Sequence, residues 1–200
     1  MLTFGEYVTR ETLTLDDVSR VVFDYLRTRN DAVLFGSHAV NAYVDPPRMT
    51  ADVDIMSTDA EGLAEDLRTL IARKFHVAVR VRSVARGQGW RVYQIRKSEN
   101  RHLVDVRQTD ELPATRVFKD IQVIAPSDLV LSKLESYAAR KHTEKGLTDK
   151  VDLYRLLRTF PRFKSENSAV SRALPDASPG ARSAWKELLS KPVEPTNDDY

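Results

Sequence analysis

The chain has 200 residues, of which 42% are hydrophobic and 30% are charged, and its formal net charge is +2. This size and balance predict one globular domain, or one domain with a small appendage, and the absence of cysteine excludes a disulfide framework or a cysteine-ligated zinc site. No stretch approaches the roughly 20 apolar residues that span a bilayer, and the first residues do not form a signal-peptide pattern, so we expect a cytoplasmic protein with no membrane partner.

Helical and strand patterns alternate over the first 126 residues, and only helical patterns follow. In chain order they predict a helix over 15–30, a strand over 31–35, a helix after Gly36-Ser37, a strand over 50–56, a helix over 59–75, strands over 76–84, 90–97, 102–108 and 120–126, a helix over 128–141 capped by Ser127, and helices over 148–160, 165–173 and 179–189. This order predicts an α+β fold in which a mixed-sheet core precedes a helical part. We expect an α/β domain over 1–125, a helical bundle over 126–190 and a loose tail over 191–200.

Asp52 and Asp54 stand two residues apart in the strand predicted over 50–56. Residues at this spacing project from one face of a strand, so the two carboxylates can converge on a divalent cation. Oxygen ligands of this kind suit Mg²⁺ or Mn²⁺. The alternative is an edge strand with two acids that face solvent.

Gly36 and Ser37 separate a predicted strand from a predicted helix. Glycine lets the backbone approach a ligand closely, and a serine hydroxyl with the first amide groups of a helix can hold a phosphate. A plain tight turn that needs a small residue is the alternative.

Basic residues gather in the middle of the chain. Residues 73–107 carry ten arginines or lysines against two acids, which indicates either a polyanionic partner or a solvated sheet face. Arg80 and Arg82 share one face of a predicted strand and can follow a phosphate backbone there.

The order of strand, Gly36-Ser37, helix, a loop with Arg48 and Thr50, and an acid pair on the next strand resembles the nucleotidyltransferase superfamily, which has the DNA polymerase β-like fold. The resemblance implies that the Gly-Ser pair holds the triphosphate of a nucleotide, that the acid pair holds two metals, and that a later strand supplies a third acid. Asp105 is the candidate for that acid. Its alternative role is an ion pair with a nearby arginine.

The segment over 125–157 resembles the helical part of AbiEii-type nucleotidyltransferases, the toxins of type IV toxin–antitoxin systems. Those proteins show R-x-T-x-D-x-D, a lysine on a later helix, and K-D-x-x-D-L. The chain matches these with Arg48, Thr50, Asp52, Asp54 and Lys133, and with "TDKVDL", in which Thr148 replaces the lysine and Asp149 and Asp152 are retained. The resemblance covers residues 30–158.

This resemblance implies transfer of a nucleoside monophosphate from a nucleoside triphosphate to an RNA acceptor, the tRNA 3′ end, with growth arrest and a cognate antitoxin as partner. The implied roles are metal binding by Asp52, Asp54 and Asp105, proton acceptance by Asp105, nucleotide binding by Gly36, Ser37, Arg48, Thr50 and Lys133, and either positioning of Lys133 or nucleotide binding by Asp149. The alternatives are a small-molecule acceptor such as an aminoglycoside, a protein hydroxyl, or a non-catalytic nucleotide- or RNA-binding relic.

Overall fold

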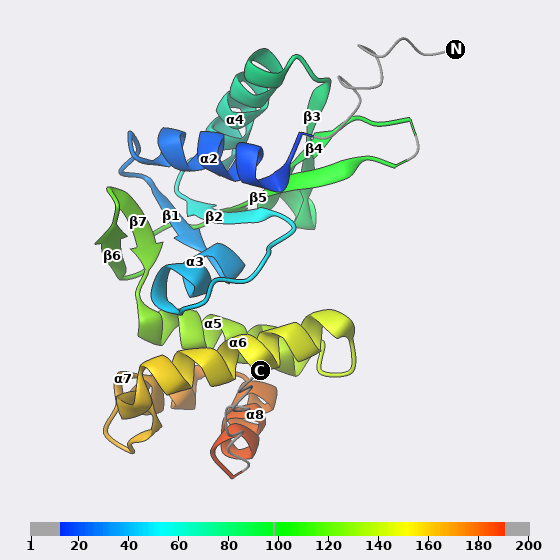
Figure 1. Ribbon diagram of the computed structural model, residues 1–200. Helices are drawn as coiled ribbons and strands as arrows, with labels where there is room; N and C mark the ends of the chain where they lie inside the picture. Colours follow the sequence, from blue (N-terminus) through cyan, green and yellow to red (C-terminus); the bar gives the residue numbers. More distant parts are fainter. Residues whose placement is uncertain (1–12, 98, 191–200) are drawn as a thin grey trace, which may run out of the picture. The chain divides into compact units, whose positions relative to one another are not determined.

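The computed structural model describes residues 13–97 and 99–190, and its elements are drawn in Figure 1. They are α2 (Leu15–Leu26), β1 (Ala32–Phe35), α3 (Gly36–Tyr43), β2 (Val53–Ser57), α4 (Ala60–Phe75), β3 (Val79–Val84), β4 (Gly89–Gln94), β5 (Arg101–Gln108), β6 (Thr115–Phe118), β7 (Ile121–Ile124), α5 (Pro126–Ala139), α6 (Glu144–Thr159), α7 (Ala169–Ala173) and α8 (Pro179–Ser190). No helix in this part of the chain is long and apolar enough to cross a membrane. The tail expected over 191–200 lies outside the described residues.

The strands form one seven-stranded sheet in the order β3-β4-β5-β2-β1-β7-β6. β3, β4 and β5 are an antiparallel meander, as predicted, whereas β2 and β5 are parallel. The predicted α+β class and mixed sheet are therefore confirmed. The sequence patterns missed β6, which has four residues, three of them exposed, and so lacks an apolar face that could be recognised.

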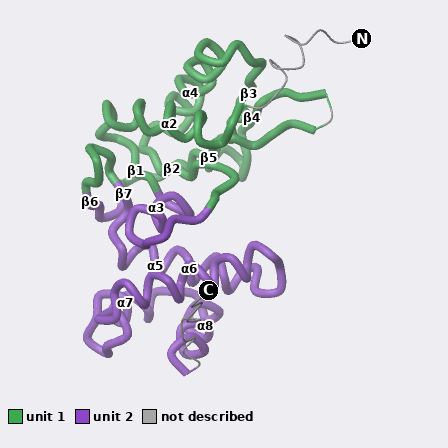
Figure 2. The backbone as a smooth tube through the Cα atoms, in the orientation of Figure 1, with its two compact units in different colours: residues 1–34, 49–112, 117–122 green, residues 35–48, 113–116, 123–200 purple. Residues whose placement is uncertain are grey.

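The chain divides into two compact units, which Figure 2 colours separately. Of the described residues, the first unit holds 13–34, Met49–Leu112 and Val117–Gln122, and the second holds Phe35–Arg48, Pro113–Arg116 and 123–190. The second unit thus includes Phe35–Arg48, which the boundary expected between residues 125 and 126 leaves with the first.

In the first unit, α4 packs on one face of β3, β4, β5 and β2, and α2 packs against α4 (Figure 1). The buried side of α4 presents Leu63, Leu67 and Ile71, and the sheet presents Val92 and Val104, all of them fully buried. The buried apolar residues of β2, β4 and β5 point toward α4. Because side chains alternate along a strand, the polar residues of these strands lie on the opposite face of the sheet.

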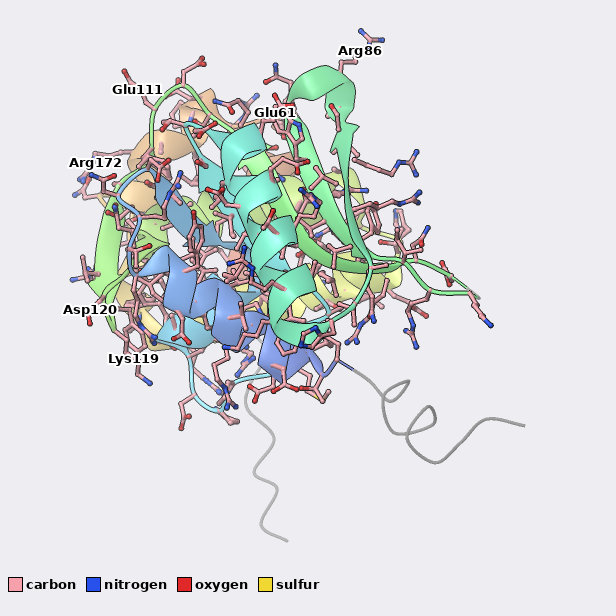
Figure 3. The ribbon with its side chains drawn as sticks, turned by 90° about the horizontal axis from the view of Figure 1, so that it is seen from above. Glu61, Arg86, Glu111, Lys119, Asp120 and Arg172 are labelled. Atoms are coloured by element: carbon pink, nitrogen blue, oxygen red, sulfur yellow. The ribbon has the colours of Figure 1, made fainter. Side chains whose placement is uncertain are left out.

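Tight turns join the strands of the first unit. Arg86 has a positive φ of 56° between β3 and β4, and its side chain points outward at the tip of this connection (Figure 3). Lys119 and Asp120, at φ 49° and 64°, form the two-residue turn between β6 and β7. Two adjacent residues with positive φ match the twist that a short hairpin needs.

In the second unit, α5 packs against α6, α7 and α8, and α3 packs against α5 and α6. Two predicted helix starts were wrong. Thr143 caps α6 at Glu144, four residues before the predicted start, because its hydroxyl accepts a hydrogen bond from the Gly146 amide. Pro126 opens α5, since its fixed φ suits the first helical position, so Ser127 lies inside the helix rather than at its cap.

Candidate active site

Two of the predicted metal ligands lie side by side in the sheet of the first unit. β2 runs parallel to β5, and the register pairs Asp54 directly with Asp105. The adjacent pair, Val53 and Val104, is buried in the core. Alternation therefore places both carboxylates on the face opposite α4. Asp52 immediately precedes β2 and stands two residues before Asp54, so it extends the same face.

A β-bulge in β5 adds a histidine to this face. Val92 of β4 pairs with Val104, but the next residue, Tyr93, pairs with His102, so Leu103 is an extra residue in β5. Leu103 and Val104 are both fully buried. The bulge therefore turns two consecutive apolar side chains into the core and brings His102 to the acidic face.

Asp105 and Asp52 lie beside basic side chains of the same face. Arg91 of β4 lies opposite Asp105, and its Nε lies 3.2 Å from Asp105 Oδ2. His102 Nδ1 lies 3.1 Å from Asp52 Oδ2. The Asp105 and Asp52 side chains are 24% and 26% exposed, so solvent reaches both pairs.

Mg²⁺ or Mn²⁺ fits these acids by donor chemistry and by strand position, because neighbouring strands hold paired side chains about 5 Å apart. Within residues 13–97 and 99–190, however, no three His, Cys, Asp or Glu side chains gather closely enough to hold a metal ion. Arg91 and His102 occupy carboxylate oxygens that a metal would use. A metal at this face would therefore compete with Arg91 for Asp105 Oδ2 and with His102 for Asp52 Oδ2.

Basic and aromatic residues continue the same face toward β3. Arg80 and Arg82 are exposed on β3, opposite Tyr93 and Arg91 of β4. The Arg80 guanidinium carbon lies 6.0 Å from the centroid of the Tyr93 ring, and that ring lies 5.2 Å from the ring of His102. The face thus carries basic residues on β3 and β4, mixed charges on β5, where Arg107 follows Asp105 by two positions, and Asp54 on β2.

The Gly36-Ser37 junction belongs to the second unit. Gly36 has a φ of 65°, in the left-handed region that glycine favours, where β1 gives way to α3. Ser37 Oγ accepts a hydrogen bond of 2.6 Å from Arg48 Nη2. Asn41 of α3 holds the Arg48 backbone, because its Oδ1 accepts from Arg48 N at 3.0 Å and its Nδ2 donates to Arg48 O at 2.7 Å. Thr50 lies in the connection before β2.

Lys133 lies at the centre of a buried ion network between α5 and α6. Its Nζ is 3.1 Å from Asp149 Oδ1 and 2.8 Å from Asp152 Oδ2, and its side chain is 7% exposed. Arg48 binds Asp152 through two nitrogens, Nε at 2.8 Å and Nη2 at 2.7 Å. Arg140 also uses two nitrogens, but its Nε and Nη2 both lie 2.7 Å from a single oxygen of Asp149, Oδ2.

This network determines the charge state of Asp152. Burial raises the pKa of its carboxyl group, but the hydrogen bonds from Arg48 and the charge of Lys133 outweigh burial and hold the pKa below its ordinary value. Asp152 is therefore a carboxylate, and its 0% exposed side chain has only cations as charged partners in the contacts described above.

The predicted site residues therefore form two groups. The first unit groups Asp52, Asp54 and Asp105 with Arg80 and Arg82, and the second groups Gly36, Ser37, Arg48, Lys133 and Asp149. Sequence reasoning did not assign Arg91, His102 or Arg140 to the site, and it named Asp152 as a retained acid without giving it a role. The adjacent apolar pair Leu103-Val104 was the one signal of the bulge that brings in His102.

No family model and no curated protein sequence matches the chain. Its fold is similar to that of the Megavirus polyadenylate synthase, with a TM-score of 0.59 and 16% identity over 80% of the chain. The chain spans only 35% of the length of that protein. It is also similar to the antibiotic-resistance factor ANT(2'')-Ia, with a TM-score of 0.53 and 12% identity over 87% of the chain and 95% of that protein. A nucleotidyltransferase-like protein from Paracoccidioides brasiliensis gives a TM-score of 0.50 and 17% identity over 86% of the chain and 87% of that protein. The chain therefore has a nucleotidyltransferase-like α+β fold.

Proposed function

We propose that the protein is a metal-dependent nucleotidyltransferase, which transfers a nucleoside monophosphate from a nucleoside triphosphate to a hydroxyl group and releases pyrophosphate. The observation that carries this proposal is the register of β2 and β5, which pairs Asp54 with Asp105; Asp52 stands two residues before Asp54 in the chain. Carboxylates gathered on one sheet face repel each other unless cations lie between them. The nucleotidyltransferase-like fold supports the same assignment.

In this proposal Asp52, Asp54 and Asp105 hold Mg²⁺ or Mn²⁺. The bound metal would supply positive charge for the entering and leaving oxygens of an in-line displacement at the α-phosphorus. Asp105 accepts the proton of the attacking hydroxyl group. The hydroxyl oxygen forms a bond to the α-phosphorus, the bond between the α-phosphorus and the bridging oxygen of the β-phosphate breaks, and pyrophosphate leaves. When Asp105 binds the metal, Arg91 no longer pairs with Asp105, and its positive charge then lies near the transferred group.

Most residues that we assign to the triphosphate belong to the second unit, and Thr50 belongs to the first. Ser37 and the first amides of α3 donate hydrogen bonds to phosphate oxygens, and Arg48 adds a charged donor beside the Ser37 hydroxyl. Thr50, in the connection that follows, is assigned to the same nucleotide. Lys133 and Asp149 stay in the proposed site.

The acceptor we propose is RNA, in particular the 3′ end of tRNA, and the resulting activity is that of a growth-arresting toxin with a cognate antitoxin. Arg80 and Arg82 are exposed on β3 and suit a phosphate backbone, and Tyr93 presents a ring of the kind that stacks on a base. The cationic half of the face disfavours a cationic acceptor.

A small-molecule acceptor is the second candidate. It is favoured by one comparison, because the chain covers 95% of ANT(2'')-Ia, whose name describes an antibiotic-resistance factor. The first unit also has acids that a cationic drug would contact, namely the residues assigned above to the metal.

A labelling experiment separates the candidates. The protein is incubated with Mg²⁺, each α-labelled nucleoside triphosphate, and total tRNA, an aminoglycoside or protein extract. We expect label on tRNA with one nucleotide, loss of this label in Asp54→Asn, and retention in Asp110→Asn, an exposed acid of the same unit. Label on the drug or on protein would replace RNA as the acceptor, and no label on any of them would contradict nucleotidyl transfer.

A further inference from the structure

A row of alternating charges leads through the second unit from the end of α5 to the Gly36-Ser37 junction. In order, its members are Arg140, Asp149, Lys133, Asp152, Arg48 and Ser37. We propose that Lys133 is a positioning residue, which sets the Arg48 guanidinium and the Ser37 hydroxyl through Asp152 and does not contact the nucleotide. This inference rests on the proposed function and changes the role that the resemblance gives to Lys133.

The surroundings of Lys133 argue against a direct contact with phosphate. Its ammonium group has three N–H donors, and the structure directs it to two carboxylates at 3.1 and 2.8 Å. Its side chain is 7% exposed, and those of Asp149 and Asp152 are 2% and 0% exposed. A phosphate could reach this ammonium only by displacing a buried carboxylate, which would then lose its partner in the interior.

Arg48 is the member that can meet a ligand. Its side chain is 25% exposed, although its binding partner Asp152 is fully buried. Arg48 Nη2 bonds both Asp152 Oδ2 at 2.7 Å and Ser37 Oγ at 2.6 Å. The position of the Asp152 carboxylate therefore sets the plane of the guanidinium, and the guanidinium sets the serine hydroxyl at the start of α3.

Lys133 is the only group in these contacts that joins the two carboxylates. Without it, Asp149 would keep Arg140 and Asp152 would keep Arg48, as two separate pairs. Asp152 would then be held from one side only, and Arg48 would no longer be tied to α5. Loss of Lys133 should thus change the position of the Arg48 side chain, although Asp152 lies between the two residues.

A double-mutant cycle tests this coupling, with the triphosphate part of the ligand represented by Mg²⁺-nucleoside triphosphates and by inorganic tripolyphosphate. We expect Lys133→Met to weaken binding on the order of ten-fold, and Arg48→Met to weaken it at least as much, since charge-assisted hydrogen bonds are lost. In the Arg48→Met background, Lys133→Met should have no further effect, because its only route to the ligand is gone. A second ten-fold loss in the double variant would show direct contact and overturn the proposal.

A spectroscopic measurement keeps the inference testable if no nucleotide binds. The Nε–H resonance of Arg48, identified by its loss in Arg48→Lys, should exchange slowly with water in the unsubstituted protein, because Nε donates to buried Asp152. Lys133→Met should shift this resonance and speed its exchange, whereas Lys145→Met, at an exposed position of α6, should not. Lys133→Gln replaces Lys133→Met if the latter does not fold. An unchanged Arg48 resonance in the folded variant would refute the coupling, independently of nucleotidyl transfer.

Discussion

The aspartates of the two units differ in their basic partners and in how far they are exposed to solvent. In the first unit, Asp52 lies beside His102 and Asp105 beside Arg91, and the two acid side chains remain 26% and 24% exposed. In the second unit, Asp149 and Asp152 each meet two cations and are 2% and 0% exposed. Water can replace a partner in the first case and cannot do so in the second.

This difference separates carboxylates that can change partners from carboxylates that cannot. A surface ion pair contributes about 0–1 kcal/mol, so an incoming metal or substrate displaces it at low cost. A buried carboxylate that loses a partner costs several times more, because its desolvation is no longer offset. We therefore assign ligand exchange to the sheet face of the first unit and fixed geometry to the network of the second.

The largest expected effect comes from breaking the buried network. Asp152→Asn should lower the free energy of unfolding by about 3–5 kcal/mol, because Arg48 and Lys133 lose their shared counterion. Asp105→Asn, its counterpart in the first unit, should change the same quantity by about 1 kcal/mol or less. Urea denaturation at neutral pH measures both. Equal losses in the two variants would show that burial does not set the strength of these ion pairs.

Metal titration tests the exposed group in the folded protein. Asp54→Asn should weaken Mn²⁺ binding by about 10- to 100-fold, since one anionic ligand is lost. Arg91→Ala should tighten it several-fold, because Asp105 no longer has a competing cation. Electron paramagnetic resonance of free Mn²⁺ gives the affinities without an activity assay. Arg86→Ala, at an outward-pointing position, is the control; weaker binding in Arg91→Ala would contradict the exchange of partners.

Acid should weaken the second unit through Asp152. Burial raises the pKa of this carboxyl group, but the lowering effect of Arg48 and Lys133 is larger, so the pKa in the folded state lies below the ordinary 3.8. The stabilisation it gives is complete above pH 3.8 and is lost as the pH falls through the folded value. Asp152→Asn should therefore show a flatter fall of unfolding free energy below pH 3.8, by up to about 1.4 kcal/mol per pH unit. Parallel curves for the two proteins would exclude this origin.

A smaller effect is expected where α8 meets α5 and α6. Hydrogen bonds from Lys141 and Lys150 lower the pKa of Glu187 from 4.5 to about 2. The Glu187 side chain is 22% exposed, so Glu187→Gln should cost only about 1 kcal/mol above pH 4.5 and nothing below pH 2. Thermal unfolding at pH 6 and pH 2 measures this difference. A loss as large as that in Asp152→Asn would mean that exposure does not govern the strength of these pairs.

The elements that the sequence predicted correctly are those whose pattern is local. Amphipathic spacing identified α4, and alternation identified β2, whose Val53, Ile55 and Ser57 are buried and whose Asp54 lies on the other face, because both patterns depend on neighbouring residues only. Alternation failed in β5, where Leu103 is an extra residue that only the pairing with β4 reveals. A single strand read alone carries no information about its register.

The buried network was the part of the candidate site that the sequence described least well. Lys133 follows Ser132 in an ordinary helical run, which gives no sign that its ammonium is buried. Asp149 and Asp152 are three residues apart and so lie on one face of α6, but their partners come from α5 and from the loop before β2. Only packing of α5 on α6 brings these charges together.

The extra residue in β5 has a consequence for tracing this protein in other genomes. His102 precedes Asp105 by three positions here, whereas a relative with a regular strand would show the same two side chains two positions apart. An aligned pair of sequences would then differ by a one-residue gap at Leu103 while both keep the histidine and the aspartate on the same surface. Such a gap should be scored as preservation of the surface, and a substitution of Asp105 in an ungapped alignment as its loss.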